Sequence, residues 1–580
     1  MQINGVSARK VEERWLIVSD LSGKVAGGIL SRILVFGLVI AFASEASGQE
    51  DEPRVEPMTL TQVIALVLRN NHDISVQDLN RVIEAERVKM AKAAFDPRFE
   101  ASYAYQDIDT PQNAQEFVAT GGGAANTPFA DTQTGLATPI LTTPTIFEQR
   151  NHVSELALIQ RLTNGATLEL GSSQRILDNT LNRNRPPGIF NSEYETYTGV
   201  TLTQPLLKDS GREVNLTEMR IAQSNTRLAD LEWRSRTAGS VANAMKLYFD
   251  VIFAYENMRI QKDAIELAET LYAGNKKRHE EGVLSPIEVL VAEGAVYTRK
   301  EDALIAETQY VERQNALQLL FRSGDGSARP LRIVPADRLK GGFEVASRST
   351  LLCAANSSRY DILQALELVD QRDRQAKFAK NQIKPRLDLI ASIGSHGLDG
   401  DLGRSYGAAA NGQGPEWTLG VTFSVPLGAK QAKAEARLAE LQAKQAEIQA
   451  DRVRLQIALE LDTVLNRIKT DRQRVITGGK SREIAGEAMT GEVKRLDEGV
   501  STTYQVLQYQ HEYSRARSRE LAALADLNKD ELDLWLITGR LLENKGIVID
   551  NDSSIEVNQE LESIGKWRHK NIVRAVPVEQ

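Results

Sequence analysis

The chain has 580 residues, of which 26% are charged and 42% hydrophobic, and it carries a formal net charge of −8. This length is enough for several domains, and the negative charge, without any Lys/Arg-rich block that contains aromatic residues, argues against a nucleic-acid-binding protein. The single cysteine, Cys353, excludes an internal disulfide framework and a paired-cysteine metal site, and we expect it to be a small buried side chain on a helix.

The first predicted element is an export signal. Arg32 is followed by the apolar run ILVFGLVIAFA and then by small and polar residues. A positively flanked apolar run of this length is typical of a secretory signal peptide, and it is shorter than the roughly 20 residues of a membrane-spanning helix. We therefore predict a signal peptide at 1–48, with cleavage after Ala43 or Gly48, and a short linker at 49–57.

A first structural repeat is predicted at 58–323. After an N-terminal helix, alternating apolar and polar residues predict strands near 97–106 and 197–205. The segment 107–196 reads as a long loop with an extra hairpin at 152–175, because Asn-Gly between two alternating runs is a strong hairpin signal. The sequence leaves open whether this hairpin adds two strands to the sheet or stays outside it.

A very long helical hairpin completes the first repeat at 211–322. No proline occurs between Gly211 and Gly282, so this arm can form a helix of roughly 70 residues, or about 105 Å. The return arm begins at Pro286, a residue that suits the first turn of a helix. Helices of this length need neighbours that cover their apolar stripes, for instance by coiled-coil packing.

The second half of the chain repeats this order of elements. Its parts are a connector at 324–348, a repeat at 349–542 with strands near 385–394 and 417–425 and a helical hairpin at 428–541, and a polar tail at 543–580. We expect the tail to be poorly ordered.

Three sequence markers occur in the same order in both halves. Pro97 matches Pro385 at an offset of 288 residues, the strand end at Pro205 matches Pro426 at 221, and the turn at Gly282 matches Gly499 at 217. Self-similarity of this kind indicates an internal duplication. The four prolines mark the predicted junctions between strands and helices.

The predicted strands have one apolar face. On the last of them, the apolar residues are Trp417, Leu419, Val421 and Phe423. This alternation suits a membrane strand between lipid and water, although a soluble sheet with one packed face gives the same pattern. No segment after the signal reaches the length of a membrane-spanning helix, so a membrane-embedded form would be a β-barrel. A few strands cannot close a barrel, so this hypothesis implies an oligomer.

The pattern resembles the TolC family of outer-membrane efflux proteins over about residues 58–542. Its most specific parts are the duplication, the segment Phe95-Asp96-Pro97, the strand end Gln204-Pro205-Leu206-Leu207 and the two glycine turns. The resemblance implies a fold of long helices plus a membrane β-barrel, built as a homotrimer with a 12-stranded barrel and a periplasmic tunnel of 12 helical strands. It also implies an outer-membrane location, a periplasmic adaptor and an inner-membrane transporter.

The resemblance places the narrowest part of the tunnel at the two turns, where acidic residues ring the aperture and polar side chains link the coils. The matching positions here are Glu288, Ser501, Gln505 and Gln508, so the second turn has amides where family members carry aspartates. Three copies of Glu288 near the axis would favour cations. The alternative for these residues is a solvated helix face.

Both turns also combine a glycine with apolar residues. Gly282 and Gly499 permit the reversal of the chain. Val283, Leu284 and Val500 would be exposed apolar residues at the tips, which suits contact with an adaptor. The alternative is that they cover the hairpins themselves.

No catalytic, cofactor or metal site is expected. The six histidines show no ligand spacing, and His279-Glu280 lacks the second histidine of a zinc helix. We therefore predict a passive outer-membrane channel, surrounded by outer-membrane lipid, of a tripartite efflux or type I secretion system. Drugs, metals, lipids and secreted proteins all remain open as cargo. The alternative is a periplasmic coiled-coil structural protein that forms no channel.

Overall fold

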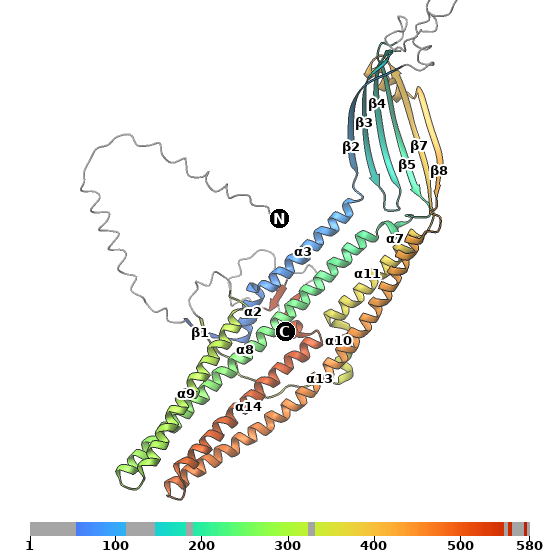
Figure 1. Ribbon diagram of the computed structural model, residues 1–580. Coiled ribbons are helices and arrows are strands. Elements are labelled where there is room, and N and C mark those ends of the chain that lie inside the picture. The colour runs from blue at the N-terminus through green and yellow to red at the C-terminus, as the bar shows by residue number, and fades with distance from the viewer. Residues whose placement is uncertain are drawn as a thin grey trace, which may run out of the picture. The chain divides into compact units, whose positions relative to one another are not determined.

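The structure is a computed structural model that describes residues 54–111, 146–180, 190–322, 331–549, 555–558 and 573–576. The predicted signal peptide at 1–48 and the glycine-rich part of the long loop lie outside these residues. The chain divides into a small unit, Met1–Glu56 with Ser327–Arg332, and a large unit that contains the rest. The large unit consists of long helices and a six-stranded sheet (Figure 1).

The six strands of this sheet are antiparallel, and their order is β2-β3-β4-β5-β7-β8. Their bounds are β2 Arg98–Pro111, β3 Ile146–Arg161, β4 Thr167–Asn179, β5 Glu193–Pro205, β7 Arg386–Asp399 and β8 Gly414–Ser424. The extra hairpin of the long loop is thus β3 and β4, and it belongs to the sheet. A 12-stranded barrel from three copies requires four strands per chain, whereas the sheet formed by the described residues has six.

The two faces of the sheet differ in polarity. Leu387 pairs with Phe423 and Ile393 with Trp417, so the apolar residues predicted for β7 and β8 share one face. The register across all six strands places Phe99 on this apolar face as well. Trp417 is 76% exposed and Phe99 67%. The opposite, polar face carries Glu100, Glu155, Glu169, Thr201, Ser392 and Thr418.

Long helices make up the rest of the large unit (Figure 1). Their bounds are α2 Leu60–Asn70, α3 His72–Ala93, α7 Arg212–Asn215, α8 Thr217–Glu280, α9 Pro286–Gln318, α10 Arg348–Ser358, α11 Tyr360–Gln382, α13 Lys430–Asp497 and α14 Thr503–Ile537. The 64 residues of α8 and the 68 residues of α13 correspond to lengths of about 96 Å and 102 Å. Among the described residues, none of the helices combines the length and hydropathy needed to cross a membrane.

Each long helix is accompanied by two shorter ones, in agreement with the lengths read from the sequence. Helices α3 and α9 pack along α8, while α11 and α14 pack along α13. Contacts of α8 with α11 and α14 join the two halves. The helices nearest the sheet therefore follow the order α3, α8, α11, α13, and those farther away the order α9, α8, α14, α13.

The four junctions with α3, α7, α11 and α13 lie at one end of the sheet. Pro97 and Pro385 immediately precede β2 and β7, Pro205 ends β5, and Pro426 follows β8 by two residues. The register pairs the first residues of β2 and β7 with the last residues of β3, β5 and β8. Proline at these positions fits the ends of strands, because it lacks the N–H that a central ladder position needs.

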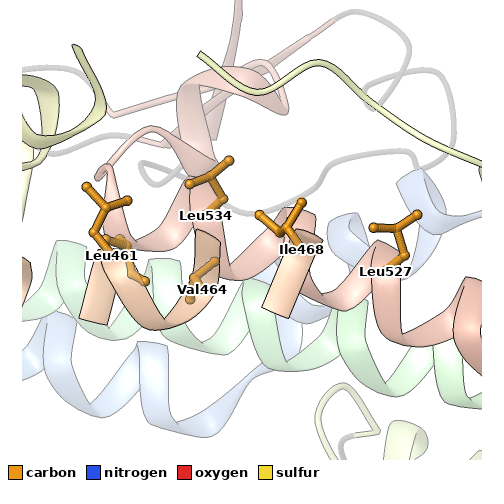
Figure 2. Close-up of a cluster of buried hydrophobic side chains, with 6 residues drawn as sticks. Leu461, Val464, Ile468, Leu527 and Leu534 are labelled. Atoms are coloured by element: carbon orange, nitrogen blue, oxygen red, sulfur yellow. The ribbon is translucent and has the colours of Figure 1, made fainter. Parts of the chain in front are cut away.

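Apolar side chains hold the helices together. One cluster joins the two arms of the second hairpin and consists of Leu461, Val464 and Ile468 of α13 with Leu527, Leu534 and Ile537 of α14 (Figure 2). Leu461 and Leu527 are fully buried. Because burial of such a side chain contributes about 1.5–3 kcal/mol, this stripe is a main source of the hairpin's stability.

Several elements were not predicted. Helix α12, Leu402–Ala410, connects β7 to β8 and packs on the apolar face, where Ser405 and Thr196 are hydrogen-bonded at 2.9 Å. Helix α15, Leu541–Asn544, crosses the predicted start of the tail at 543, and the tail contains a sheet of β9 Ile547–Ile549, β10 Ile555–Asn558 and β11 Val573–Val576. These parts of the tail therefore have regular structure. Strands β1 Arg54–Met58 and β6 Leu331–Pro335 form a two-stranded sheet.

The prediction for Cys353 is half correct. The residue lies on α10, as expected, but its side chain is exposed. The buried positions of this helix are the next two, Ala354 and Ala355. Cys353 therefore lies on the other face of the helix and does not contribute to the core.

Candidate functional site

The two helical hairpins reverse direction at similar glycine turns. The φ angles of Gly282 and Gly499 are 77° and 78°, a left-handed conformation that strains any residue with a Cβ. In both turns the glycine N–H donates to a carbonyl three residues earlier, His279 O at 2.9 Å and Leu496 O at 3.1 Å. This is how glycine commonly ends a helix.

Apolar side chains surround both turns. Val283 is 76% exposed and Val500 62%. Leu284 differs from the expectation, because it is only partly exposed; its carbonyl oxygen lies 2.8 Å from Nδ1 of His279, which holds the turn against the end of α8. Further exposed apolar residues follow in the first turns of α9 and α14. We define the tip surface as Val283, Ile287, Leu290, Val500 and Tyr504.

Glu288 connects the two hairpins. Its Oε2 accepts a hydrogen bond from the backbone N–H of Thr503, the first residue of α14, at 3.2 Å. The first N–H groups of a helix have no partner within the helix, and a carboxylate is stabilised there by the helix dipole. Asn275 of α8, which is 1% exposed, adds a bond from Nδ2 to Thr503 Oγ1 at 2.8 Å.

Arg278 makes a second connection between the hairpins. It donates to the carbonyl oxygen of Leu496 at 3.3 Å and forms an ion pair with Asp497. Asp497 is largely exposed, so this ion pair contributes at most about 1 kcal/mol. We call these contacts of Asn275, Arg278 and Glu288 with the second hairpin the tip network.

The other residues predicted for the aperture bond within the second hairpin. Ser501 donates to the carboxylate of Glu492 and lies 3.0 Å from Oε1 of Gln505. Gln508 donates to the hydroxyl of Tyr504 at 2.9 Å. Among the described residues, no hydrogen bond joins Glu288 to Gln505 or Gln508. The structure thus brings Glu288 to the other hairpin and leaves the two glutamines on their own helix.

Glu492 is an acidic residue at the second turn that the sequence reasoning missed. It is 5% exposed and pairs with Arg495 at 3.2 Å. The spacing of three residues between Glu492 and Arg495 is a recognisable helical ion-pair signal. That signal does not reveal that the side chain of Glu492 is buried, because its burial depends on the neighbouring helix.

A histidine lies between α9 and α14 above the tips. Arg299 of α9 donates to Nδ1 of His511 of α14 at 3.0 Å. Burial, and then the positive charge of Arg299, lower the pKa of His511. His511 is therefore a neutral acceptor at neutral pH and keeps this link between the hairpins.

A buried pair of carboxyl groups lies beside the apolar cluster of the second hairpin. Asp530 of α14 is 4% exposed and Asp471 of α13 is 8% exposed. Burial, and then a hydrogen bond with Asp471, raise the pKa of Asp530 to about 7. Arg467 is 3.5 Å from Asp530 and also pairs with Asp533 at 2.9 Å. Two neighbouring buried carboxyls cannot both ionise easily, so they hold a proton between them.

Comparison with known proteins gives a family match over more than half of the chain. The family described as "Outer membrane efflux protein" matches residues 161–321 and 351–540. The fusaric acid resistance protein FusA of Burkholderia cepacia is 26% identical over 221 residues. That alignment covers 37% of this chain and 39% of FusA, so it spans about two-fifths of the curated relative.

Solved structures of outer-membrane channels share the fold. The CmeC channel of Campylobacter jejuni has a TM-score of 0.53 at 17% identity, with 83% of this chain and 86% of that chain covered. The channel CusC gives 0.57 at 14% identity, with 86% and 95% covered. The outer-membrane protein VceC of Vibrio cholerae gives 0.54 at 15% identity, with 83% and 96% covered.

Proposed function

Because the chain belongs to the outer membrane efflux protein family, we propose that three copies of it form the outer-membrane channel of an efflux system. The channel is a passive duct that extends into the periplasm. The observation that carries this proposal is the sheet, which has one exposed apolar face, one polar face and long helices attached at one end only. Such a sheet suits a wall between lipid and an aqueous pore.

The edges of the sheet and of the helical layer favour closure by further copies. Strands β2 and β8 are edge strands, and an unpaired edge is not tolerated in lipid. Helix α3 exposes Val76, Ile83 and Met90 at heptad spacing, and α13 exposes Leu441 and Ile448 in the same way. Apolar stripes of this kind are covered by partner helices. We infer that β8 and α13 of one copy meet β2 and α3 of the next, in the homotrimer that the resemblance implies.

Three copies of a six-stranded sheet give a barrel of 18 strands. Strands spaced about 4.8 Å apart and tilted by about 40° each occupy roughly 6.3 Å of circumference, so six need about 38 Å. Four helices of one chain need about 32–40 Å. The sheet and the helical layer of one protomer therefore have similar widths, so the barrel and the tunnel have similar circumferences where they meet. Four strands would cover only about 25 Å.

The proposed mechanism needs no catalytic residue. Cargo moves along the polar inner face of the barrel and through the lumen that the helices of the three copies enclose. A periplasmic adaptor binds the tip surface, and an inner-membrane transporter supplies the energy. Opening separates the two hairpins at the tip network, and the contacts between Asn275, Arg278, Glu288 and the second hairpin support this part of the proposal. The fusaric acid resistance in the name of FusA makes organic acids the first cargo to test.

Planar-bilayer recording of the purified full chain tests this function. We expect the protein to need detergent for extraction and to give discrete conductance steps. A protein that is released from membranes by salt alone, and that gives no steps, would instead be a periplasmic coiled-coil structural protein. Electron microscopy of the purified complex tests the strand number: 18 strands are expected, and 12 would place β3 and β4 outside the wall.

A further inference from the structure

A basic pocket lies between α8 and α11, directly next to the strand-to-helix junctions. Its volume is about 450 Å³. Six cationic side chains and two carboxylates line it, namely Arg212, Arg220, Arg374, Lys377, Lys380 and Lys384 with Glu213 and Asp370. No part of the proposed channel function uses this concentration of positive charge.

Half of these cations form an ion pair with a described residue, and half do not. Three of them are paired along or between the helices, Arg374 with Asp370, Lys377 with Asp373 and Lys380 with Glu440, at 2.8–3.1 Å. Within the part of the chain that the structure describes, Arg212, Arg220 and Lys384 form no ion pair. Unpaired charges of one sign around a cavity repel one another, so a bound anion would stabilise the site.

Partly buried hydrogen bonds fix the walls of the pocket. Asn381, which is 6% exposed, accepts from the backbone N–H of Asp209 at 2.8 Å and donates to Leu207 O at 3.3 Å. Gln382 donates to the Asp209 carboxylate, and Asn215 donates to the Asp209 carbonyl, both at 2.7 Å. The loop after β5 is therefore fastened to α11 without any ligand, and a preorganised pocket loses less free energy on binding.

The pocket lies at the boundary of the apolar face. Lys384 precedes Leu387 by three residues, which is about 10 Å at most, and the Cα partner of Leu387 is Phe423, an exposed member of the apolar face. Phe378 lines the pocket and is 39% exposed. Helices α8 and α11 are the inner helices of the layer, so copies that meet at α3 and α13 do not cover the pocket.

We propose that this pocket binds the phosphate group of an anionic phospholipid at the inner leaflet of the outer membrane, with Arg220 and Lys384 as its main ligands. Guanidinium and ammonium groups bind phosphate strongly, and basic pockets at a membrane surface take anionic head groups. Phe378 is placed to contact the apolar part of the lipid. A soluble phosphate ester carries the same anionic group. The claim that the phosphate belongs to a membrane lipid rests on the proposed function, whereas the claim that the pocket binds a phosphate group does not.

Binding to the purified full chain in a neutral detergent tests this proposal. Native mass spectrometry measures retention of added dioleoylphosphatidylglycerol, and calorimetry measures binding of glycerol phosphate. The test variant is the double substitution Arg220→Gln with Lys384→Gln. The control is Lys433→Gln, an exposed cation in the first turn of α13 that does not line the pocket. We expect the control to bind like the wild type and the double variant to bind about 30-fold more weakly.

Each outcome has a defined meaning. Retention of the lipid without binding of glycerol phosphate supports the pocket and its membrane source, while similar binding of both supports the pocket and assigns a soluble source. Absence of binding in both arms, or an equal loss in the control and the double variant, overturns the proposal. Lipid retention needs no conductance, so a protein that retains lipid but forms no pore refutes the proposed function alone.

Discussion

The contact between Glu288 and the start of α14 can be separated into charge and hydrogen bond by two substitutions. Glu288→Gln keeps an oxygen that can accept from the Thr503 N–H and removes only the charge. Glu288→Ala removes both. If this contact exists only while the hairpins are together, both variants raise the fraction of open channels, and alanine raises it more.

The size of the effect follows from the geometry. A charge at a helix N-terminus contributes about 0.3–1 kcal/mol, so glutamine should raise the ratio of separated to joined hairpins about 2- to 5-fold in each copy of the chain. A hydrogen bond to a charged group contributes about 1.5–3 kcal/mol, so alanine should raise it about 10- to 150-fold. Asn275 and Arg278 remain in place in both variants, so the closed state still forms.

Open probability in single-channel recordings at neutral pH measures this ratio. The matched control is Glu281→Gln, which removes the same charge from an exposed residue of the turn, one whose side chain forms no hydrogen bond or ion pair with the described residues. An unchanged open probability in Glu288→Ala would refute the role of this contact. An equal rise in Glu281→Gln and Glu288→Gln would show that only the net charge of the tip matters.

Three further predictions concern stability. The pKa of Asp530 is about 7 in the folded state, against 3.8 for a free carboxyl. The contribution of Asp530 to the free energy of unfolding is therefore complete below about pH 4. It declines between pH 4 and pH 7, by at most about 1.4 kcal/mol per pH unit. Asp530→Asn should remove this slope from helix melting followed by circular dichroism, and an unchanged slope would contradict the shared proton. Leu527→Ala should destabilise the second hairpin by about 2–5 kcal/mol in the same assay, and a loss below about 1 kcal/mol would mean that the cluster is not tightly packed. A Cβ on Gly397 would lie 1.9 Å from the backbone of α12, whereas a Cβ on Gly407 meets nothing within 4 Å. Gly397→Ala should therefore speed tryptic cleavage within α12, while the control Gly407→Ala should not. Equal cleavage rates in the two variants would show that α12 adapts to the added methyl group.

The parts of the fold that the sequence predicts are those with local signals. The absence of proline over long stretches, Pro286 at a helix start and glycine after the helix ends place the hairpins and their turns to within a few residues. The alternating residues of β7 and β8 predict which side chains share a face, and the register agrees. These signals act over a few residues, so a single sequence displays them.

The remaining features depend on contacts between distant segments. Glu288 and Thr503 are 215 positions apart, and no property of either residue predicts that they meet. More than 30 residues separate the end of β2 from the start of β3, so the chemistry of a tight turn could not predict the register of this pair. Helix α12 was missed because its glycines resemble a turn, and because part of the sheet surface that stabilises it belongs to β5, about 200 positions earlier in the chain.

The way in which β3 and β4 enter the sheet bears on how such channels can diverge. β2 and β5 correspond to β7 and β8 of the other half, and an inserted antiparallel pair leaves their directions unchanged. All four junctions with α3, α7, α11 and α13 stay at the same strand ends, so the gain or loss of this pair leaves the connections between the sheet and the helical layer unchanged. In a lineage of such proteins, strand number then changes in steps of two per chain while helix number stays constant, and each step changes the width of the sheet by about 13 Å.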